Sequence, residues 1–324
     1  MLHRRHLLGM AALTALAAPG AWAKDFPSRN ITLLVPYPAG GHTDQLAREL
    51  AGYMGKALNA SVIVDNRPGG AAQIAVSALL KEPADGHTLL IGDVPTISTN
   101  IGLFPKLAYN PRTDFQPLTQ LTVAPGLFVV PVNSPFKTLA DLVAYAKANP
   151  QKPLNYASQG VGTGGHLFTT LFSKKLGVEM NHVPYRGSTP GLMDVIAGNV
   201  DFFYDTVPSA SPFVLSGKMR ALALGEGERM SILPEVPTLR ELGFGDIMPT
   251  FWYGAVAKAG TPPELVAQLS QVMVQAMKNP AIAQKFTNQG ILIRTSSPDA
   301  FRKYTLEESD RWVKVMKAAG MKAE

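Results

Sequence analysis

The 324-residue chain contains no cysteine, which excludes a disulfide framework and a lipid-modified N-terminal cysteine. Beyond the first residues, no apolar run reaches the roughly 20 residues that a membrane-spanning helix needs, so we expect a soluble mature chain. No basic run with interleaved aromatic residues occurs, which argues against a nucleic-acid partner. Low-complexity segments are also missing. The sequence is therefore typical of a folded protein without disulfide bonds.

The first 23 residues have the parts of an export signal. Arg4 and Arg5 form a basic head, an apolar stretch follows, and small residues stand at Ala21 and Ala23. We expect cleavage after Ala23 and a periplasmic location. An ordinary signal and a twin-arginine signal, which exports folded proteins, both fit the paired arginines. Removing the signal leaves 28 basic against 24 acidic residues, a net charge of +4.

Short β-rich runs alternate with stretches of helical periodicity along the rest of the chain. The runs ITLLVPY, SVIVDN and TLLIGD belong to a βαβαβ pattern, which is typical of a parallel sheet. A second series follows a proline-rich crossover, with the runs GLFVVPV, LNYAS, MNHVPY, VDFFYD and MRALALG. Because a single core stops growing at about 250 to 300 residues, we expect an α/β fold with two domains, each a mostly parallel sheet flanked by helices.

The order of these runs predicts a discontinuous first domain. Residues 24–125 together with 250–324 are expected to form domain 1, and residues 126–249 domain 2. The largely helical tail from Pro262 to Ala319 would return to cover domain 1. Two crossovers between the domains would make a hinge beside a ligand cleft.

Two helix starts have the Ser/Thr-x-x-acid spacing of a reciprocal N-terminal cap. Thr138 and Asp141 form one such pair, and Thr261 and Glu264 form the other, with Pro262 in the first turn. The first cap also bears on the S-x-x-K pattern of exported serine acylases, which Ser134 to Lys137 match. Both residues would precede the helix, so the pattern does not indicate an acylase.

Gly-Gly-His occurs twice, at residues 40–42 and 164–166, each time between a strand and an amphipathic helix. Glycines at such a turn let a ligand approach the backbone, and the first N–H groups of the helix attract anions. For one glycine pair, a tight turn is the simpler interpretation. Two matched copies favour a cleft with an anion-binding turn on each side, beyond the carboxyl ends of the strands. A side chain at Gly41 or Gly165 should then block binding while the fold survives.

A dinucleotide site is the competing interpretation of the second turn. Residues 160–165 spell G-x-G-x-x-G after a strand and before a helix. The acid expected at the end of the next strand is missing, since that strand ends at Tyr185-Arg186, although Arg186 would suit a 2′-phosphate. The alternative function is thus an exported α/β NAD(P)-dependent oxidoreductase.

The mature histidines do not indicate a metal site, because none shares a helix face with another. His87 is expected in a turn and His182 in a strand. His42 and His166 open helices, where the dipole favours a neutral imidazole, and both ligand contact and a simple helix-start role stay open for them. We expect the aromatic residues 251–253 to belong to an interdomain core.

Several longer segments, taken in order, resemble the solute receptors of tripartite tricarboxylate transporters, also called Bordetella uptake receptors. They are VPYPAGGHTDQLAREL, VIVDNRPGGAAQIA, PADGHTLL, YNPRTDFQPLT, AYAKANPQKPLNYASQGVGTGGHL, HVPYRGSTPGLMDVIAGNVDFFYD, LPEVPTLRELGF and FWYGAVAKAGTPPELV. The resemblance runs from about Phe26 to Trp312. It implies a monomeric periplasmic two-domain receptor, not an enzyme and without a cofactor. Such a receptor closes on a small carboxylate, a di- or tricarboxylate or an aromatic or hydroxy acid, and delivers it to a two-component membrane permease.

The resemblance also assigns the ligand site, residue by residue. It implies binding by Tyr37, Ala39, Gly40, Gly41 and Thr43 in the first turn, by Ser158, Gly162, Thr163, Gly164 and His166 in the second, and by Asp205. Gly165 joins the second turn through the glycine pattern itself.

Three residues depart from the family pattern and are expected near the cleft mouth: His42, Asp93 and Thr206. We expect Asp93 and Asp205 to lie near the ligand without binding its carboxylates, because acids repel a polyanion. They would accept hydrogen bonds from ligand hydroxyl, amine or water groups. Asn66 and Arg67 are expected to form a structural turn in which Arg67 braces the strand ends.

Overall fold

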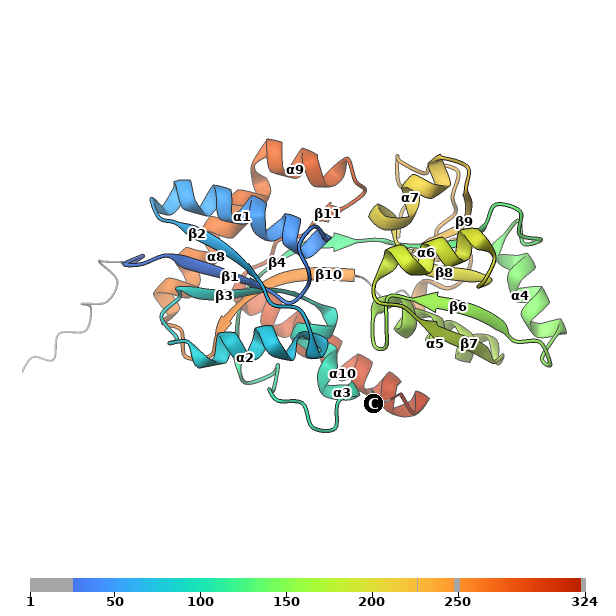
Figure 1. The fold of residues 1–324 in the computed structure, drawn as a ribbon, viewed down its shortest axis with the longest axis horizontal. Coiled ribbons are helices and arrows are strands. Elements are labelled where there is room, and N and C mark those ends of the chain that lie inside the picture. Colours follow the sequence, from blue (N-terminus) through green and yellow to red (C-terminus); the bar gives the residue numbers. More distant parts are fainter. Residues whose placement is uncertain (1–25, 226, 248–250, 322–324) are drawn as a thin grey trace, which may run out of the picture.

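The structure is a computed structural model and describes residues 26–225, 227–247 and 251–321. The predicted export signal and its cleavage after Ala23 lie outside the described residues. Figure 1 shows two lobes, each built on one sheet with helices packed on it. Within the described residues, no helix is both long and apolar enough to cross a membrane.

The first lobe contains a six-stranded sheet in the order β11-β4-β10-β3-β1-β2. Its strands are β1 (Ile31–Val35), β2 (Val62–Asn66), β3 (Thr88–Asp93), β4 (Phe115–Ala124), β10 (Phe251–Lys258) and β11 (Leu292–Ile293). β1 pairs in parallel with β2 and β3, whereas β10 pairs antiparallel with β3 and β4, and β11 antiparallel with β4. Strands β1 to β4 therefore share one direction.

The second lobe contains a five-stranded sheet in the order β7-β6-β8-β5-β9. Its strands are β5 (Gly126–Pro131), β6 (Leu154–Ser158), β7 (Met180–Pro184), β8 (Phe202–Thr206) and β9 (Met219–Gly225). β6 is parallel to β7 and β8, and β5 runs against both of its neighbours. Two mixed sheets in which most strands share a direction confirm the predicted α/β fold.

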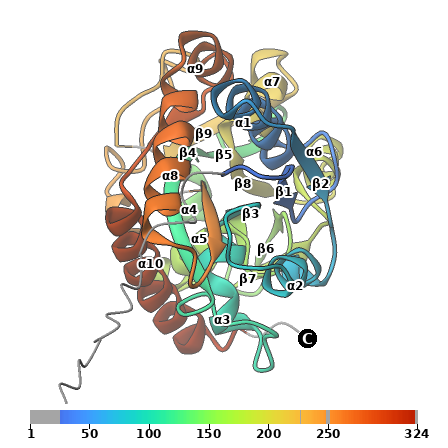
Figure 2. The ribbon, with the colours of Figure 1, turned by 90° about the vertical axis from the view of Figure 1, so that its left-hand side faces the viewer.

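Helices cover both faces of each sheet and bury their apolar sides there. They are α1 (His42–Leu58), α2 (Gln73–Lys81), α3 (Asn100–Leu103), α4 (Leu139–Ala148), α5 (Gly164–Leu176), α6 (Ser188–Ala197), α7 (Val207–Leu215), α8 (Pro263–Lys278), α9 (Pro280–Thr287) and α10 (Pro298–Ala319). On the first sheet, α1, α8 and α9 share a core on one face, and α2 and α10 pack on the other. Figure 2 shows α1 and α9 above this sheet and α2 and α3 below it. On the second sheet, α4 and α5 cover one face and α6 and α7 the other.

The chain crosses between the two sheets twice, first from β4 to β5 and later from the second sheet back to β10. β4 ends at Ala124, and after Pro125 the chain continues as β5 in the second sheet. It returns to the first sheet as β10, between β3 and β4. A strand inserted after such a return runs against its neighbours, which explains the mixed pairing.

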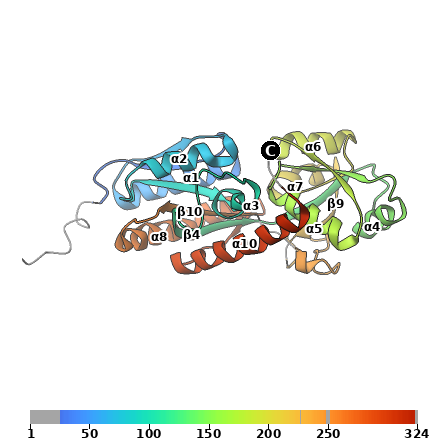
Figure 3. The same cartoon turned by 90° about the horizontal axis from the view of Figure 1, so that it is seen from below.

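The last helix, α10, contacts both lobes. Its residues Trp312 and Met316 form a buried cluster with Leu103 of α3 and Leu167 of α5. The ammonium group of Lys174 in α5 also donates to the carbonyl of Ala318 at 2.6 Å. Figure 3 shows α10 extending from beneath the first sheet towards α5.

One of the two predicted helix caps is confirmed. Thr138 and Asp141 exchange both hydrogen bonds of a capping box, so α4 begins at Leu139. The cap predicted at Thr261 and Glu264 is wrong. The Thr261 hydroxyl instead donates to the carbonyl of Lys258 at 2.8 Å, and α8 begins after Pro262.

Candidate functional site

The first glycine turn joins β1 to α1 and leaves the start of that helix uncovered. Ala39, Gly40 and Gly41 are exposed. Gly40 has a φ of +93°, which favours glycine, whereas Gly41 is the N-cap residue with a φ of −77° and no side chain to cap the helix. A Cβ at either position would meet nothing within 4 Å. The two glycines therefore border open space at the end of α1 where the dipole is positive and backbone N–H groups lack partners within the helix.

Behind this turn, the buried carboxylate of Asp44 holds three groups together. Its Oδ2 accepts hydrogen bonds from the N–H of Gly40 and from Nε of Arg48, both at 2.9 Å. Its Oδ1 accepts one from Nδ2 of Asn66 at 3.0 Å. Arg48 holds the pKa of Asp44 below its usual value. The N–H of Gly40 is thus used within the protein, which leaves Gly41 and the first residues of α1 as the available donors.

Asn66 braces the turn with its side chain, and Arg67 does so with its backbone. Besides Asp44, Nδ2 of Asn66 contacts the carbonyl of Tyr37 at 3.1 Å. The guanidinium of Arg67 instead pairs with the nearby Asp65 at 2.8 Å, and its side chain is about half exposed. The backbone N–H of Arg67 donates to the carbonyl of Val35 at 2.8 Å, so Arg67 joins the ends of β1 and β2 through its main chain.

His42 begins α1 and turns its ring towards the sheet. Nε2 lies 3.1 Å from Oγ1 of Thr122, and the ring packs edge-on against Tyr253 with centroids 4.3 Å apart. Burial lowers the pKa of His42 to about 4, so the imidazole is neutral at pH 7. Nδ1 is buried and has no partner among the described residues. Thr43, the next residue, is also buried.

Asp93 ends β3 and is fully engaged by neighbouring hydroxyl groups. Tyr37 donates to its Oδ2 at 2.6 Å, and the Thr96 hydroxyl donates to its Oδ1 at 2.7 Å. Burial raises the pKa of Asp93, while these hydrogen bonds oppose the increase. Asp93 therefore anchors Tyr37 and the start of the segment after β3.

The second glycine turn joins β6 to α5 and is built differently from the first. The N–H of Gly162 donates to Nδ1 of His166 at 3.0 Å, and the Thr163 hydroxyl donates to the carbonyl of Gly160 at 2.7 Å. Gly160 and Gly162 have φ values of +131° and +78°. The turn is closed by its own hydrogen bonds.

The remaining glycines of this turn are buried in contacts with distant residues. A Cβ at Gly162 would lie 2.0 Å from Leu103, and one at Gly164 would lie 2.5 Å from Phe251. At Gly165 a Cβ would lie 2.6 Å from the carbonyl oxygen of Tyr204. The second turn thus packs directly against the first lobe. The expectation that Gly165→Val leaves the fold intact is not supported.

Two stacked histidines lie beneath the second turn. The rings of His166 and His182 are parallel within 10°, with centroids 3.9 Å apart. Burial lowers the pKa of His166 to about 3 and that of His182 to about 4. Nε2 of His182 lies 2.6 Å from the hydroxyl of Ser158. That hydroxyl also contacts the backbone of Gly160, so the buried serine is a structural link rather than a nucleophile.

Asp205 ends β8 and joins three connections of the second sheet. Its Oδ1 accepts hydrogen bonds from Nε2 of Gln159, from the Ser188 hydroxyl at 2.8 Å and from the N–H of Thr206 at 2.7 Å. Its Oδ2 is buried and has no partner among the described residues, and the same holds for Oε1 of Gln159. Burial raises the pKa of Asp205 to about 6.

Tyr253 lies where the two halves of the site meet. In the sheet it stands opposite Asp93 on β3 and Thr122 on β4. Its side chain packs against the cores of both lobes. Burial raises the pKa of Tyr253 above its usual value, and the charges of Asp93 and Asp205 add to the increase. Its hydroxyl has no hydrogen-bond partner in the described part of the chain.

A sequence model of the tripartite tricarboxylate transporter family receptor matches residues 46–321. The chain belongs to this family. Protein BugT of Bordetella pertussis is 31% identical over 98% of the chain and 97% of its own length. A structure of Rpa4515 from R. palustris with adipate has a TM-score of 0.83 at 35% identity, covering 92% of this chain and all of the other. MatC from Rhodopseudomonas palustris with bound malate has a TM-score of 0.79 at 32% identity, covering 90% and 99%.

Membership in this receptor family makes the chain a solute-binding receptor and not an enzyme. The oxidoreductase alternative is therefore excluded. The glycines that would approach a pyrophosphate in the G-x-G-x-x-G run are instead packed on Leu103 and Phe251. No group of three or more metal-binding side chains occurs among the described residues.

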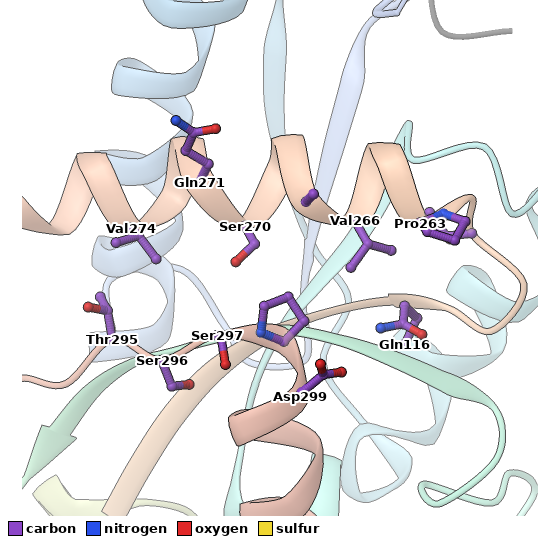
Figure 4. A pocket seen from close by; sticks show the side chains of 13 residues that line it. Gln116, Pro263, Val266, Ser270, Gln271, Val274, Thr295, Ser296, Ser297 and Asp299 are labelled. Carbon is purple, nitrogen blue, oxygen red and sulfur yellow. The ribbon is translucent and has the colours of Figure 1, made fainter. Parts of the chain in front are cut away.

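A groove of about 730 Å³ lies elsewhere on this receptor, between α8 and the start of α10. Figure 4 shows Gln271, Ser270 and Val266 of α8 on one side and Ser297 and Asp299 on the other. None of the site residues predicted from sequence lines it. The groove therefore gives no support to a ligand site at the glycine turns, which stays a prediction.

Some of the predicted site residues lie in two groups, one in each lobe. The first contains Tyr37, His42 and Asp93, and the second contains Ser158, His166 and Asp205. The sequence did not single out Asp44, Gln159 or Ser188, and it placed Tyr253 in an interdomain core rather than at the ligand site. Gln159 directly follows β6, and Asp93 is the last residue of β3. A polar residue at the end of a strand could therefore have marked Gln159 as a candidate in the sequence.

Proposed function

We propose that this receptor binds a small carboxylate, a di- or tricarboxylate or an aromatic or hydroxy acid, between its two sheets. The exposed first turn is the observation that carries this proposal. Gly41 leaves open space at the start of α1, where backbone N–H groups and the helix dipole attract an anion. Gly41, the start of α1 and the second turn, including Gly164 and Gly165, are the proposed ligand contacts.

In this proposal, the second turn contacts the ligand only through backbone N–H groups. Its glycines are buried against Leu103, Phe251 and Tyr204, so their side-chain positions do not open onto solvent. The N–H groups at the start of α5 lack acceptors within the helix, as at any helix start. We infer that the first turn receives the carboxylate from solvent and the second completes the site.

Closure of the cleft would be a hinge motion of two domains, residues 24–125 with 250–324 and residues 126–249. The short Pro125 connection between β4 and β5 supports this division, because a single residue separates strands of different sheets. The contact of α10 with α5 would limit the opening on its side.

The liganded receptor would be a monomer that delivers its ligand to the membrane subunits of a tripartite transporter. The family to which the chain belongs supports this partner. The relatives solved with adipate and malate support a dicarboxylate as the first class to test.

A thermal-shift screen of aliphatic and aromatic mono-, di- and tricarboxylates tests the proposal. The protein should first be unfolded and refolded, so that retained metabolite does not mask a shift. A ligand at 100 times its dissociation constant stabilises the folded state by about 2.7 kcal/mol. A clear increase in melting temperature with at least one acid is expected, and no shift with any acid would contradict carboxylate binding.

A further inference from the structure

At one end of the second sheet, Asp205 and Gln159 each have a buried oxygen that accepts no hydrogen bond from the described residues. Asp205 is fully buried, and its Oδ1 already accepts three hydrogen bonds. Its Oδ2 and Oε1 of Gln159 have no partner among the described residues. A buried acceptor without a donor is costly, by about 1 to 3 kcal/mol and more for a charged group. Most buried polar atoms are paired, so two orphan acceptors on linked side chains need an explanation.

No cation of the described residues compensates Asp205. Its recorded partners are an amide, a hydroxyl and a backbone N–H, all of them neutral. Isolated buried carboxylates are unfavourable unless a donor or a cation reaches them. The missing donor is therefore not supplied by the described part of the protein.

These acceptors lie at the edge of the sheet where a ligand is expected. Gln159 follows β6, Asp205 ends β8, and Ser188 begins α6. Ligands of open α/β sheets bind beyond the carboxyl ends of the strands. Asp205 stands opposite Leu127 of β5, two residues after Pro125, which joins the two sheets. The orphan acceptors are thus close to the junction of the two lobes.

A purely structural role for Asp205 explains its Oδ1, which links three connections, but not its Oδ2. We propose that Asp205 and Gln159 form a subsite for a hydrogen-bond-donating substituent, a hydroxyl or an ammonium group, carried by the carboxylate ligand. This inference rests on the proposed carboxylate-binding function and narrows its ligand class. The receptor then selects substituted acids over acids of the same length that lack a donor.

Three four-carbon dicarboxylates that differ at one position test the subsite: succinate, malate and aspartate. They carry hydrogen, hydroxyl and ammonium at the same carbon. Calorimetric titration at pH 7.5 of the refolded mature protein should show malate or aspartate binding at least about tenfold tighter than succinate, the effect of one hydrogen bond to a charged group. If five-carbon acids bind more tightly, glutarate, 2-hydroxyglutarate and glutamate replace them. The better of the two substituted acids tells which donor the subsite takes.

Asp205→Asn is the decisive variant, because it keeps an oxygen for the three existing donors and replaces Oδ2 with an N–H donor. In this variant, the affinity for malate or aspartate should fall to within about threefold of the affinity for succinate. Asp194→Asn removes the same charge from α6, where Asp194 accepts from Tyr185 at 2.6 Å, and should keep the preference. Gln159→Leu, which removes the other orphan acceptor, should also reduce the preference and replaces Asp205→Asn if that variant fails to fold.

The outcomes separate this inference from the proposed function. Binding of dicarboxylates without preference for a donor, or a preference that persists in a folded Asp205→Asn variant, would overturn the subsite and leave carboxylate binding intact. Binding of no carboxylate at all would overturn the proposed function, and the subsite with it.

Discussion

The backbone N–H of Gly162 donates a hydrogen bond of 3.0 Å to Nδ1 of His166, four residues further along the chain. This bond requires an unprotonated Nδ1, so the neutral ring carries its proton on Nε2. His166 thereby fixes the conformation of the second turn. The N–H of Gly162 is thus bound by the His166 side chain and is not available to a ligand.

Replacing His166 by phenylalanine should loosen the second turn, since the buried N–H of Gly162 loses its acceptor. We expect a lower melting temperature and about fivefold weaker carboxylate binding, the value of one neutral hydrogen bond. His166→Asn places an amide oxygen near the position of Nδ1 and should restore much of the affinity. Titration calorimetry of both variants provides the comparison, and equal affinity in the two would argue that the hydrogen bond has no part in binding.

Tyr253→Phe tests whether the junction of the two lobes contacts the ligand. The ring contact with His42 would remain, whereas the hydroxyl, which has no hydrogen-bond partner in the described part of the chain, would be lost. We expect an unchanged melting temperature without ligand and several-fold weaker binding, because a hydrogen bond is worth about 1 kcal/mol. Unaltered affinity would remove Tyr253 from the site.

Acidification should destabilise the protein. Burial holds the pKa of His42 and of His182 at about 4, and that of His166 at about 3, against 6.5 in the unfolded chain. The unfolded state therefore binds protons more readily than the folded state. The contribution of these histidines to the free energy of unfolding is fully present above pH 6.5 and is lost as the pH falls towards 4. For His42 alone the pKa difference corresponds to on the order of 3 kcal/mol.

Asp205 acts in the opposite direction over part of this range. Its folded pKa of about 6 exceeds the ordinary value of 3.8, so it destabilises the folded state above pH 6 and ceases to do so towards pH 4. Its neighbours Gln159, Ser188 and Thr206 do not titrate in this range, and burial moves Tyr253 well above it. Three histidines outweigh one acid, so chemical denaturation from pH 7 to 4 should show a net loss. His42→Phe should flatten the curve, and an unchanged pH dependence would contradict the assigned cause.

Gly165→Ala should destabilise the fold, because the new Cβ would lie 2.6 Å from the carbonyl of Tyr204. Overpacking of this kind costs about 1 to 3 kcal/mol or more. Gly41→Ala is the matched control, since its Cβ meets nothing within 4 Å at an ordinary φ, and its stability should stay within about 0.5 kcal/mol of wild type. Circular-dichroism melts that show no difference between the two variants would contradict the packing described for the second turn.

The fold was predictable because its signals are local. Strand runs and helix periodicity stand next to each other in the chain. The first glycine pair lies between a strand and a helix as predicted, whereas Gly164 and Gly165 are already the first residues of α5. The burial of residues 251 and 252 also agrees with the expected core. Local patterns such as these depend on neighbouring residues alone.

The unequal roles of the two turns were not predictable in this way. Gly162 is packed on Leu103 and Gly164 on Phe251, residues that are distant in sequence and meet them only in the folded protein. The same holds for the stacking of His166 on His182, which requires β7 to lie beside β6. The two glycines of the Gly-Gly-His sequence are thus exposed in the first lobe and buried in the second.

The central claim is that backbone N–H groups at the first turn bind the ligand carboxylate, and Gly41→Val tests it most directly. The side chain would occupy the open space before α1 without disturbing the packing. Calorimetric titration with the best carboxylate of the thermal-shift screen should show binding weakened by roughly tenfold to more than a hundredfold, the loss of a charge-assisted hydrogen bond of about 1.5 to 3 kcal/mol, at an unchanged melting temperature. Wild-type affinity in the folded Gly41→Val protein would contradict the claim.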